Sequence, residues 1–467
     1  MSHDVAVPLD TVHISERLIR RFDRSGPRYT SYPTADRFRA DFDSSHYITA
    51  LTERQKKTVL PPYSVYVHLP FCASLCYFCA CNKIITQDHS RSSSYVDAVF
   101  KEMQLLEPYL GQQRATGQLH LGGGTPTFLQ AHELNKLMHG IQQHFQFTAD
   151  AELSIEIDPR TVNAETLSYL AELGFNRTSF GVQDFDPDVQ QAINRVQPLE
   201  MVEMAMASSR AAGFESINTD LIYGLPKQSI ASFSDTVDAL VALRPDRIAL
   251  YNYAHLPQRF KSQRLIKTDD LPSAEERLQI FLMASQRLLD AGYEYIGLDH
   301  FALPNDELNL ARLDHSLQRN FQGYTTRADS DLIGLGVSAI GKVGGTHIQN
   351  QRSLKAYRAS IAAGELATFR GVVMDDDDQL RSELIMTLMC SMPVSFALFK
   401  QRYGIEIPSY FSAELTALQP YIEAELVTLT DSSLQITAKG RLFVRAISME
   451  FDKYLRQATS ATYSRLI

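Results

Sequence analysis

The feature that most constrains the fold is a series of alternating strand and helix patterns between residues 63 and 298. Strand patterns, rich in β-branched and aromatic residues, occupy 63–69, 118–121, 152–158, 177–183, 216–224, 247–253 and 293–298. Helix patterns occupy 163–174, 198–213, 230–243 and 273–292. Repeated strand–helix units predict a parallel sheet or barrel with functional groups at the carboxyl ends of the strands. Six such units predict a partial barrel rather than a closed one.

The two ends of the chain follow other patterns. The run SGPRYTSYPTADRF at 25–38 predicts an ordered loop or arm. Helical patterns dominate after residue 350, where an acidic run, MDDDDQ, is followed by helix, hairpin and helix over 424–447. A winged helix has that order and can bind DNA, but a packing role fits the acidic flank better. We therefore expect an α/β fold with an N-terminal arm (1–60), a partial (β/α)6 barrel (61–350) and a C-terminal, mostly helical, winged-helix-like domain (351–467).

The composition argues against several classes of protein. Lys and Arg number 45 against 54 Asp and Glu, a formal net charge of −9, which disfavours bulk affinity for nucleic acid or an anionic membrane. No run of about 18 apolar residues is present, and the first residues lack the apolar segment of a secretory signal. We expect a monomer in the reducing cytoplasm, with no nucleic-acid partner and no membrane span.

Four of the five cysteines lie together in HLPFCASLCYFCACNK, directly after strand 63–69. Cys72, Cys76 and Cys79 have the spacing C-x-x-x-C-x-x-C, and Cys81 follows. In a reducing compartment, crowded thiols indicate metal binding rather than disulfides. Zinc would normally use a second Cys or His pair; His68 is near, so zinc stays open, but iron–sulfur is favoured. Three thiolates would leave one iron of a four-iron cluster free for another ligand.

The run GGGTPT at 122–127 ends the next strand of the series. Glycines let the backbone approach a ligand closely, and we expect their N–H groups to be free to point at it. No Gly-Lys-Ser/Thr follows, so the run is not a phosphate-binding P-loop. Each polar residue at a strand end is as easily a structural cap, but a series on successive strands predicts a cofactor site. Those residues are Glu156, Gln183, Asp220 and His300.

These motifs, in this order, resemble the radical S-adenosylmethionine (SAM) enzymes and, among them, the oxygen-independent coproporphyrinogen III oxidases. The similarity is carried by SGPRYTSYPTADRF, YVHLPFCASLCYFCACNK, HLGGGTPT, GVQDFDPDVQQAINRVQ, NTDLIYGLPKQ, LDHFALPNDEL and RNFQGYTT. It covers nearly the whole chain and is weakest at the N-terminus and after residue 350. The resemblance implies oxidative decarboxylation of two propionate side chains of coproporphyrinogen III to vinyl groups, giving protoporphyrinogen IX in anaerobic heme biosynthesis.

The resemblance also implies the cofactors and their residues. One [4Fe–4S] cluster is held by Cys72, Cys76 and Cys79, with Cys81 outside the ligand set, and two SAM molecules bind. An electron donor similar to flavodoxin or ferredoxin and an unidentified electron acceptor are implied as partners. The residues that match the first SAM site are Tyr66, Phe78, Gly123, Glu156 and Ile340. Those that match the second are Gly124, Thr125, Gln183, Arg195, Asp220 and Ala254. The expected catalytic residues are Tyr66, Glu156, Arg195 and Asp220.

Two further expectations concern the substrate and the alternatives. Coproporphyrinogen carries four propionates, so basic side chains should line its pocket; the candidates are Arg21, Arg24, Arg28, Arg312 and Arg319. A related heme chaperone shares the first three cysteines and GGGTP, but it lacks an equivalent of Cys81 and an N-terminal arm of this kind. A winged-helix regulator with an iron–sulfur sensor is disfavoured by the net charge and by the strand–helix series.

Overall fold

The computed structural model of the chain describes residues 16–22, 24–327 and 330–457. They divide into two units. The sheet unit comprises residues 37–283 and 329–373, and the terminal unit comprises residues 1–36, 284–328 and 374–467. The start of the predicted N-terminal arm and the last ten residues of the predicted C-terminal domain lie outside the described residues. The predicted boundaries at residues 60 and 350 stay predictions.

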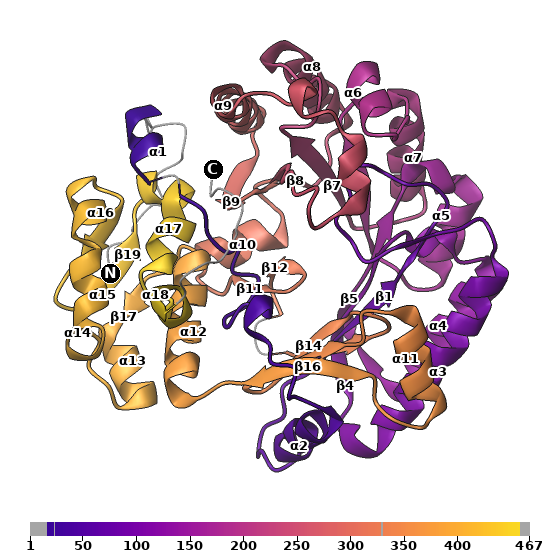
Figure 1. The fold of residues 1–467 in the computed structure, drawn as a ribbon, viewed down its shortest axis with the longest axis horizontal. Helices are drawn as coiled ribbons and strands as arrows, with labels where there is room; N and C mark the ends of the chain where they lie inside the picture. Colours follow the sequence, from indigo (N-terminus) through magenta and orange to yellow (C-terminus); the bar gives the residue numbers. More distant parts are fainter. Residues whose placement is uncertain (1–15, 23, 328–329, 458–467) are drawn as a thin grey trace. The chain divides into compact units, whose positions relative to one another are not determined.

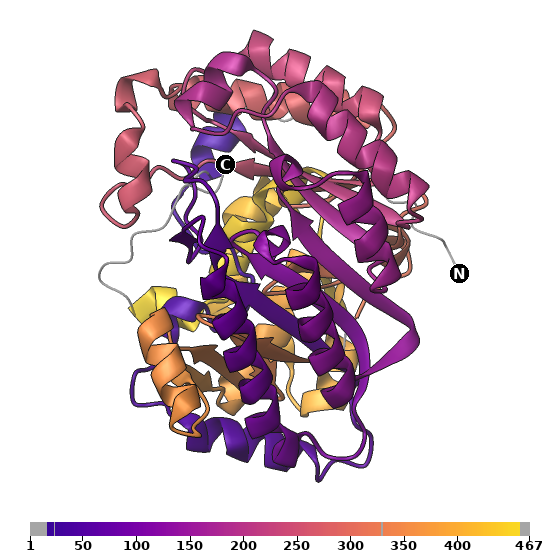
Figure 2. The ribbon, with the colours of Figure 1, turned by 90° about the vertical axis from the view of Figure 1, so that its right-hand side faces the viewer.

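The sheet unit is built around parallel strands that neighbour one another in chain order. They are β1 (Tyr63–Leu69), β4 (Ala115–Gly123), β5 (Gln146–Ile157), β6 (Arg177–Gln183), β7 (Ser216–Tyr223) and β8 (Arg247–Asn252). The helices that follow them are α3 (Ser90–Leu110), α4 (Ala131–His144), α5 (Ala164–Glu172), α6 (Pro187–Ala192), α7 (Leu199–Ala211), α8 (Ile230–Leu243) and α9 (Ala274–Asp290). Figure 1 shows α3, α4, α5 and α7 outside the strands, and Figure 2 shows the purple helices lying over them. The strand–helix series confirms the predicted partial barrel.

The local sequence explains these elements. Strands covered on both faces need apolar residues on both faces, and every residue of β1 except Tyr66 is buried. In register, Val65 lies beside Leu119 of β4 and Ile333 of the strand on the other side. Helix α5 begins where predicted because the Asn163 side chain accepts a hydrogen bond from the backbone of Thr166 at 2.9 Å.

The sheet also extends beyond β1 in a way that the sequence analysis did not predict. Strand β13 (Asp331–Leu335) pairs in parallel with β1, and three antiparallel strands follow: β14 (Ile340–Val343), β15 (Thr346–Asn350) and β16 (Thr368–Val373). Two helices, α2 (Ser44–Arg54) and α11 (Leu354–Ala362), complete this side. Buried Arg54 bonds Asp331 at 2.7 Å and so ties α2 to β13.

The terminal unit contains short strands and many helices. Its strand pairs are β9 (Glu294–Gly297) with β10 (His300–Ala302), β11 (Gln318–Asn320) with β12 (Gly323–Thr325), and a sheet of β17 (Val394–Ser395), β19 (Ser433–Ile436) and β18 (Val427–Leu429). Its helices are α1 (Glu16–Phe22), α10 (Glu307–Leu313), α12 (Asp376–Met389), α13 (Phe396–Tyr403), α14 (Ile407–Tyr410), α15 (Ser412–Ala417), α16 (Gln419–Glu423), α17 (Val444–Met449) and α18 (Lys453–Gln457). The antiparallel β18–β19 hairpin between α16 and α17 confirms the predicted helix, hairpin, helix order. Within the described ranges, no helix has both the length and the apolar character needed to cross a bilayer.

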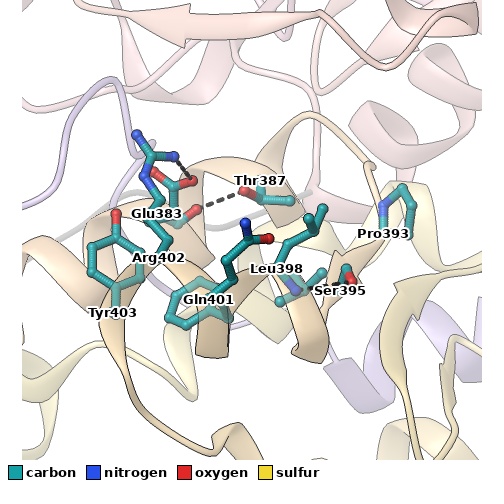
Figure 3. A pocket seen from close by; sticks show the side chains of 10 residues that line it. Glu383, Thr387, Pro393, Ser395, Leu398, Gln401, Arg402 and Tyr403 are labelled. Carbon is teal, nitrogen blue, oxygen red and sulfur yellow. Dashed lines mark hydrogen bonds and ion pairs between the residues drawn. The ribbon is translucent and has the colours of Figure 1, made fainter.

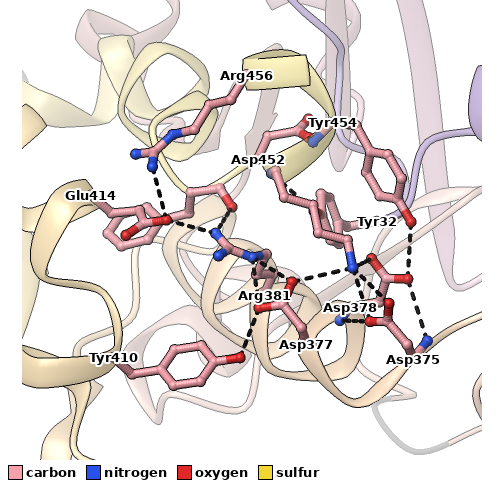
Figure 4. A network of polar contacts seen from close by, with 12 residues as sticks. Tyr32, Asp375, Asp377, Asp378, Arg381, Tyr410, Glu414, Asp452, Tyr454 and Arg456 are labelled. Atoms are coloured by element: carbon pink, nitrogen blue, oxygen red, sulfur yellow. Dashed lines mark hydrogen bonds and ion pairs between the residues drawn. The ribbon is translucent and has the colours of Figure 1, made fainter. Parts of the chain in front are cut away.

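The acidic run forms the start of α12, as Figure 4 shows. Asp375 caps the helix by accepting a hydrogen bond from the backbone N–H of Asp378 at 2.6 Å. The ammonium group of Lys453 lies 2.9 Å from Asp375 and 3.2 Å from Asp377, and Arg381 bonds Asp377 at 2.9 Å. Carboxylates at a helix N-terminus are stabilised by the helix dipole. The run therefore serves to cap this helix and pair with these two cations.

Candidate active site

A cavity of about 430 Å³ lies in the sheet unit, where the cysteine loop meets the carboxyl ends of the strands. Most of the predicted site residues line it: Cys72, Cys76, Phe78, Cys79, Gly123, Gly124, Thr125, Glu156, Gln183, Arg195 and Asp220. Tyr66, Ala254 and Ile340 are not among its lining residues. His300 belongs to the terminal unit, where its Nδ1 lies 2.9 Å from Asp299. Strand-end groups far apart in sequence thus meet in one place.

The cysteine loop begins with a short strand, β2 (Phe71–Cys72), paired with β3 (Ile84–Ile85). Cys72 and Cys76 are buried, Cys79 is half-buried and Cys81 is exposed. Burial raises the pKa of Cys72 to about 11. A hydrogen bond between their side chains lowers the pKa of Cys79 and raises that of Cys81. The described residues include no group of three or more His, Cys, Asp or Glu side chains placed to hold one metal ion.

The glycine loop packs against the cysteine loop. The N–H of Gly124 donates to the carbonyl of Leu69 at 2.8 Å, and the N–H of Thr125 donates to the carbonyl of Phe71 at 2.8 Å. A side chain at position 124 would come within 2.8 Å of the Phe71 oxygen, and Gly123 has a φ of +117°. The prediction that these N–H groups are free was wrong, because the close approach made possible by glycine is to the chain's own backbone.

Glu156 is held on one side of the cavity by two donors. Its Oε2 accepts from the N–H of Gly123 at 3.0 Å, and its Oε1 lies 3.2 Å from Nε2 of His120. Desolvation alone would raise the pKa of Glu156, but the hydrogen bond and charge of His120, together with the Gly123 N–H, outweigh it and lower that pKa. The cavity therefore contains a carboxylate that stays ionised and has a fixed position.

Tyr66 acts beside this group although it does not line the cavity. Its hydroxyl lies 3.0 Å from Nδ1 of His68, whose Nε2 lies 2.8 Å from the carbonyl oxygen of Asn82. A carbonyl can only accept, so Nε2 carries the proton of the neutral ring and Tyr66 donates to Nδ1. The ring of Tyr66 also stacks on His120, with centroids 5.9 Å apart and planes 15° apart. Tyr66 thus orders the two histidines that flank the Glu156 and Gly123 pair.

Asp158, just after β5, is a site residue that the sequence analysis missed. Its Oδ2 lies 2.6 Å from Nη2 of Arg160 and 3.1 Å from Nη1 of Arg195. Desolvation would raise the pKa of Asp158, but the charges of the two arginines outweigh it and lower that pKa. The two guanidinium groups also reach the Sγ of Cys76, at 3.6 Å from Arg160 and 3.5 Å from Arg195. The sequence signal for this site was the pair of charged residues in DPR, directly after a strand.

The part of the cavity formed by β6 and β7 has fewer hydrogen-bond partners for its polar groups. Asp220 accepts from the amide of Asn218 at 2.9 Å, and burial followed by repulsion from Glu156 raises the pKa of Asp220 to about 7. Gln183, with a φ of +69°, ends β6 and is buried. Its Oε1 has no hydrogen-bond partner among the described residues. This side therefore presents acceptor groups that a bound molecule can satisfy.

The donor set fits an iron–sulfur cluster with a polar organic cofactor beside it. Arg160 and Arg195 carry one more positive charge than Asp158 removes, and this charge would balance that of a thiolate at Cys76 if Cys76 held the cluster. The acceptors of Gln183 and Asp220 suit the hydroxyl and ammonium groups of a nucleoside-bearing amino acid such as SAM. The remaining buried sulfur, Cys72, accepts from the hydroxyl of Thr125 at 3.5 Å.

The terminal unit has a cavity of about 540 Å³ between α12 and α13, shown in Figure 3. Its charged groups are already paired, because Arg402 bonds Glu383 at 2.8 Å, and apolar side chains such as Leu398 and Phe399 form much of the rest. None of the predicted site residues lines it. We therefore place the chemistry in the sheet unit.

The basic residues predicted for the substrate all belong to the terminal unit. Arg24 bonds Glu450 at 2.6 Å, and Arg312 bonds Glu294 at 3.2 Å. Arg28 lies 3.5 Å from Asp299, whose pKa is lowered against desolvation by the hydrogen bond and charge of His300 and by Arg28 and Arg319. Arg21 stacks on Phe22 and Arg319 on Tyr324.

Comparison with known proteins identifies this arrangement. Residues 66–240 match the radical SAM superfamily, and residues 374–443 match the HemN C-terminal domain. The oxygen-independent coproporphyrinogen III oxidase of Pseudomonas aeruginosa is 45% identical, with 98% of this chain and 100% of that protein covered. Its namesake from Escherichia coli is 44% identical, with 96% and 98% covered. The solved structure of coproporphyrinogen III oxidase (HemN) from Escherichia coli, described as a radical SAM enzyme, superimposes with a TM-score of 0.90 at 42% identity and covers 95% of this chain and 99% of that one.

These matches extend over both units, and they agree with the chemistry of the cavity. Radical SAM proteins use a [4Fe–4S] cluster and SAM, the two groups that the cysteine loop and the strand ends fit. Identity of this degree extends over nearly the full length of several relatives. The chain therefore belongs to the oxygen-independent coproporphyrinogen III oxidases of the radical SAM superfamily.

Proposed function

We propose that the chain converts two propionate side chains of coproporphyrinogen III into vinyl groups and so forms protoporphyrinogen IX in oxygen-independent heme biosynthesis. Each propionate then loses CO2, one hydrogen atom and one electron. The names of the relatives support the substrate. The observation that carries the proposal is the meeting of four cysteines, two guanidinium groups and three carboxyl groups around one cavity in the sheet unit.

The cysteine loop supplies the metal ligands in this proposal. Cys72, Cys76 and Cys79 hold the [4Fe–4S] cluster, and Cys81, which is exposed, stays outside the ligand set. When bound, the cluster supplies the electron that splits SAM into methionine and a carbon radical able to remove hydrogen from the substrate. The chain positions these groups and keeps water from them, since the hard chemistry belongs to the cofactors.

We extend the proposal to two SAM molecules, one for each side of the cavity. Glu156, ionised and fixed by two donors, serves the first site with Tyr66, Phe78, Gly123 and Ile340. Asp220 and Gln183 lie on the other side with unfilled acceptor capacity. They serve the second site with Gly124, Thr125, Arg195 and Ala254. Tyr66, Glu156, Arg195 and Asp220 are the proposed catalytic residues, because they order or contact the cofactors at the reacting end.

The proposal for the substrate rests on cationic side chains of the terminal unit. Arg28 and Arg319 surround Asp299 together with His300, and the two guanidinium groups outnumber the single carboxylate, so this group of residues carries a net positive charge. Arg21, Arg24 and Arg312 are further candidates for the propionates. If Arg28→Gln leaves the KM for coproporphyrinogen III unchanged, Arg28 is not a substrate ligand.

The remaining partners follow from the reaction. A one-electron donor similar to flavodoxin or ferredoxin must reduce the cluster, and a separate acceptor must take the electron released from each propionate. We propose that the chain works as a monomer in the cytoplasm, where reducing conditions preserve both the cluster and the exposed thiol of Cys81.

An anaerobic assay tests the proposed function directly. Reconstituted protein, SAM, a reductant and coproporphyrinogen III should release two CO2 per porphyrinogen and consume SAM. The Cys76→Ser variant is the control, because it should retain the fold and lose turnover. Tight heme binding without release of CO2 from coproporphyrinogen III would instead support a heme chaperone.

A further inference from the structure

The proposed function gives no role to Arg160, a charged residue that lines the cavity. Arg160 lies in the short helix η4 (Pro159–Thr161), which Asp158 caps. Its Nε and its backbone N–H donate to Oδ1 of Asp158 at 2.9 and 3.1 Å, and its Nη2 donates to Oδ2 at 2.6 Å. The two guanidinium hydrogen bonds to one carboxylate hold the side chain in a single orientation, and the backbone bond fixes the turn that carries it.

That orientation directs Arg160 at one sulfur. Its Nη2 carries two hydrogens, so besides Asp158 it can donate to the Sγ of Cys76, which lies 3.6 Å away. Arg195 reaches the same sulfur at 3.5 Å from its Nη1. Cys76 and Asp158 are both more than nine-tenths buried, and the low polarity strengthens these contacts.

Among the described residues, no guanidinium group donates to the sulfur of Cys72, Cys79 or Cys81. The hydrogen bond to the sulfur of Cys72 comes from the neutral hydroxyl of Thr125. The ammonium of Lys83 donates to the carbonyl oxygen of Cys79 at 2.8 Å, and after the hydrogen bond with Cys81 it also helps to lower the pKa of the Cys79 thiol. Both guanidinium groups that donate to a cysteine sulfur therefore contact Cys76. Charged N–H donors lower the energy of a sulfur that gains negative charge, and hydrogen bonds to sulfur are known to set cluster potentials.

We propose that Arg160 is a positioning residue for the iron–sulfur cluster: oriented by Asp158, it donates to the thiolate of Cys76 and raises the cluster's reduction potential. In the step concerned, the oxidised cluster gains one electron from a one-electron donor, and the added negative charge is shared with the ligating sulfurs. A nearby cation stabilises that charge, so reduction becomes easier. The inference rests on the cluster of the proposed function and is independent of the substrate.

The test is a reduction titration of the reconstituted protein with dithionite, followed by electron paramagnetic resonance. Arg160→Gln should lower the midpoint potential, because it removes the cation at Cys76. We expect the equilibrium constant for reduction to fall about tenfold, which corresponds to about 59 mV for a one-electron couple. Arg160→Lys keeps the charge without the fork and should show a smaller fall. The matched control is Arg210→Gln, which breaks an Arg–Asp pair of 2.6 Å with Asp246, outside the cavity.

The outcomes separate this inference from the function itself. A midpoint potential of Arg160→Gln equal to that of wild type and of Arg210→Gln, with full iron content, overturns the role of Arg160 and leaves the proposed reaction intact. If Arg160→Gln does not fold or does not keep iron, Arg160→Met, which removes the charge from a side chain of similar length, decides, and an unchanged potential there also overturns it. Failure of the wild-type chain to bind a cluster would overturn the proposed function.

Discussion

The acidic side chains at β5 and at β7 have pKa values that are shifted in opposite directions. On the β5 side, Glu156 and Asp158 each accept from two or more donors, and both have lowered pKa values. On the β6–β7 side, Asp220 has a raised pKa of about 7 and the Oε1 of Gln183 lacks a partner among the described residues. The same cavity thus contains charged, fixed groups at β5 and groups short of partners at β6 and β7.

This difference indicates which side chains of the site are already held in place before the cofactors bind. Completed hydrogen bonds on the β5 side hold the side chains near the cysteine sulfurs in place, which lowers the cost of ordering them later. Unfilled acceptors on the β6–β7 side cost stability in the empty protein and regain it when a ligand donates to them. The β5 side is therefore the framework for the cluster, and the β6–β7 side is the part whose energy depends on ligand.

The largest effect is expected from removing a cysteine that holds the iron–sulfur cluster. Cys72→Ser, Cys76→Ser and Cys79→Ser should each lose the cluster, because a serine hydroxyl is a poor substitute for a thiolate ligand. Cys81→Ser should keep it, since Cys81 is exposed and outside the proposed ligand set. Iron and sulfide content after anaerobic reconstitution, with the visible absorption of the cluster, measures this. Loss of iron from Cys81→Ser would refute the three-cysteine assignment.

The next largest effect is expected when the framework side loses its charge. Glu156→Gln keeps the shape but removes the carboxylate that Gly123 and His120 hold. A hydrogen bond to a charged group contributes about 1.5–3 kcal/mol, so affinity for SAM should fall about 10- to 100-fold. Equilibrium dialysis with labelled SAM measures the change, and Glu203→Gln, on the exposed surface of α7, is the control. Unchanged affinity would remove Glu156 from the SAM site.

The contributions of Asp220 and Glu156 to stability should also change with pH in opposite directions. The pKa of Asp220 rises from about 3.9 when unfolded to about 7 when folded, so the empty protein loses stability as pH rises between these values. Asp220→Asn removes that loss and should gain about 2 kcal/mol relative to wild type by neutral pH, about half the full shift because solvent screens a half-buried carboxyl. Glu156→Gln should instead lose stability at neutral pH, since the lowered pKa of Glu156 stabilises the fold there.

Urea denaturation of the cluster-free protein at several pH values measures these differences. The gain of Asp220→Asn should disappear below about pH 4, where the carboxyl is protonated in both states. A gain that does not change with pH would mean that packing, rather than ionisation, causes it.

Much of the framework could be predicted because it depends on local patterns. The strand 177–183 and the helix 230–243 occur where expected, since apolar periodicity and caps specify them. Strands β13 and β14 were missed because Gly334, Gly336 and Gly341 weaken the strand pattern there, and pairing with β1 decides the outcome.

Some residues of the site could likewise be predicted from local patterns, and others could not. Glu156, Gln183 and Asp220 could be predicted because parallel strands bring their carboxyl ends to one edge. Arg160 could not, because its contact with Cys76 depends on the turn that Asp158 caps and on the direction of one guanidinium. The bonds of Gly124 and Thr125 to the cysteine loop join segments far apart in sequence, and no local pattern reports them.

The smallest expected effect separates ligand binding from stability on the β6–β7 side. Gln183→Asn shortens the side chain at a position with φ of +69°, which Asn tolerates. The empty protein should change by less than about 0.5 kcal/mol, because the Oε1 of Gln183 has no partner among the described residues to lose. Affinity at one of the two proposed SAM sites should fall about 2- to 10-fold, as one neutral hydrogen bond predicts.

Binding isotherms for SAM on the reconstituted protein, fitted for two sites, provide the measurement. A weakened second site with an unchanged first site supports the division of the cavity, and Glu156→Gln should show the reverse pattern. If Gln183→Asn weakens both sites equally, or destabilises the empty protein as much as it weakens binding, the two sides are not energetically distinct. The residues at β5 and those at β6–β7 would then contribute to stability and to SAM binding in the same way.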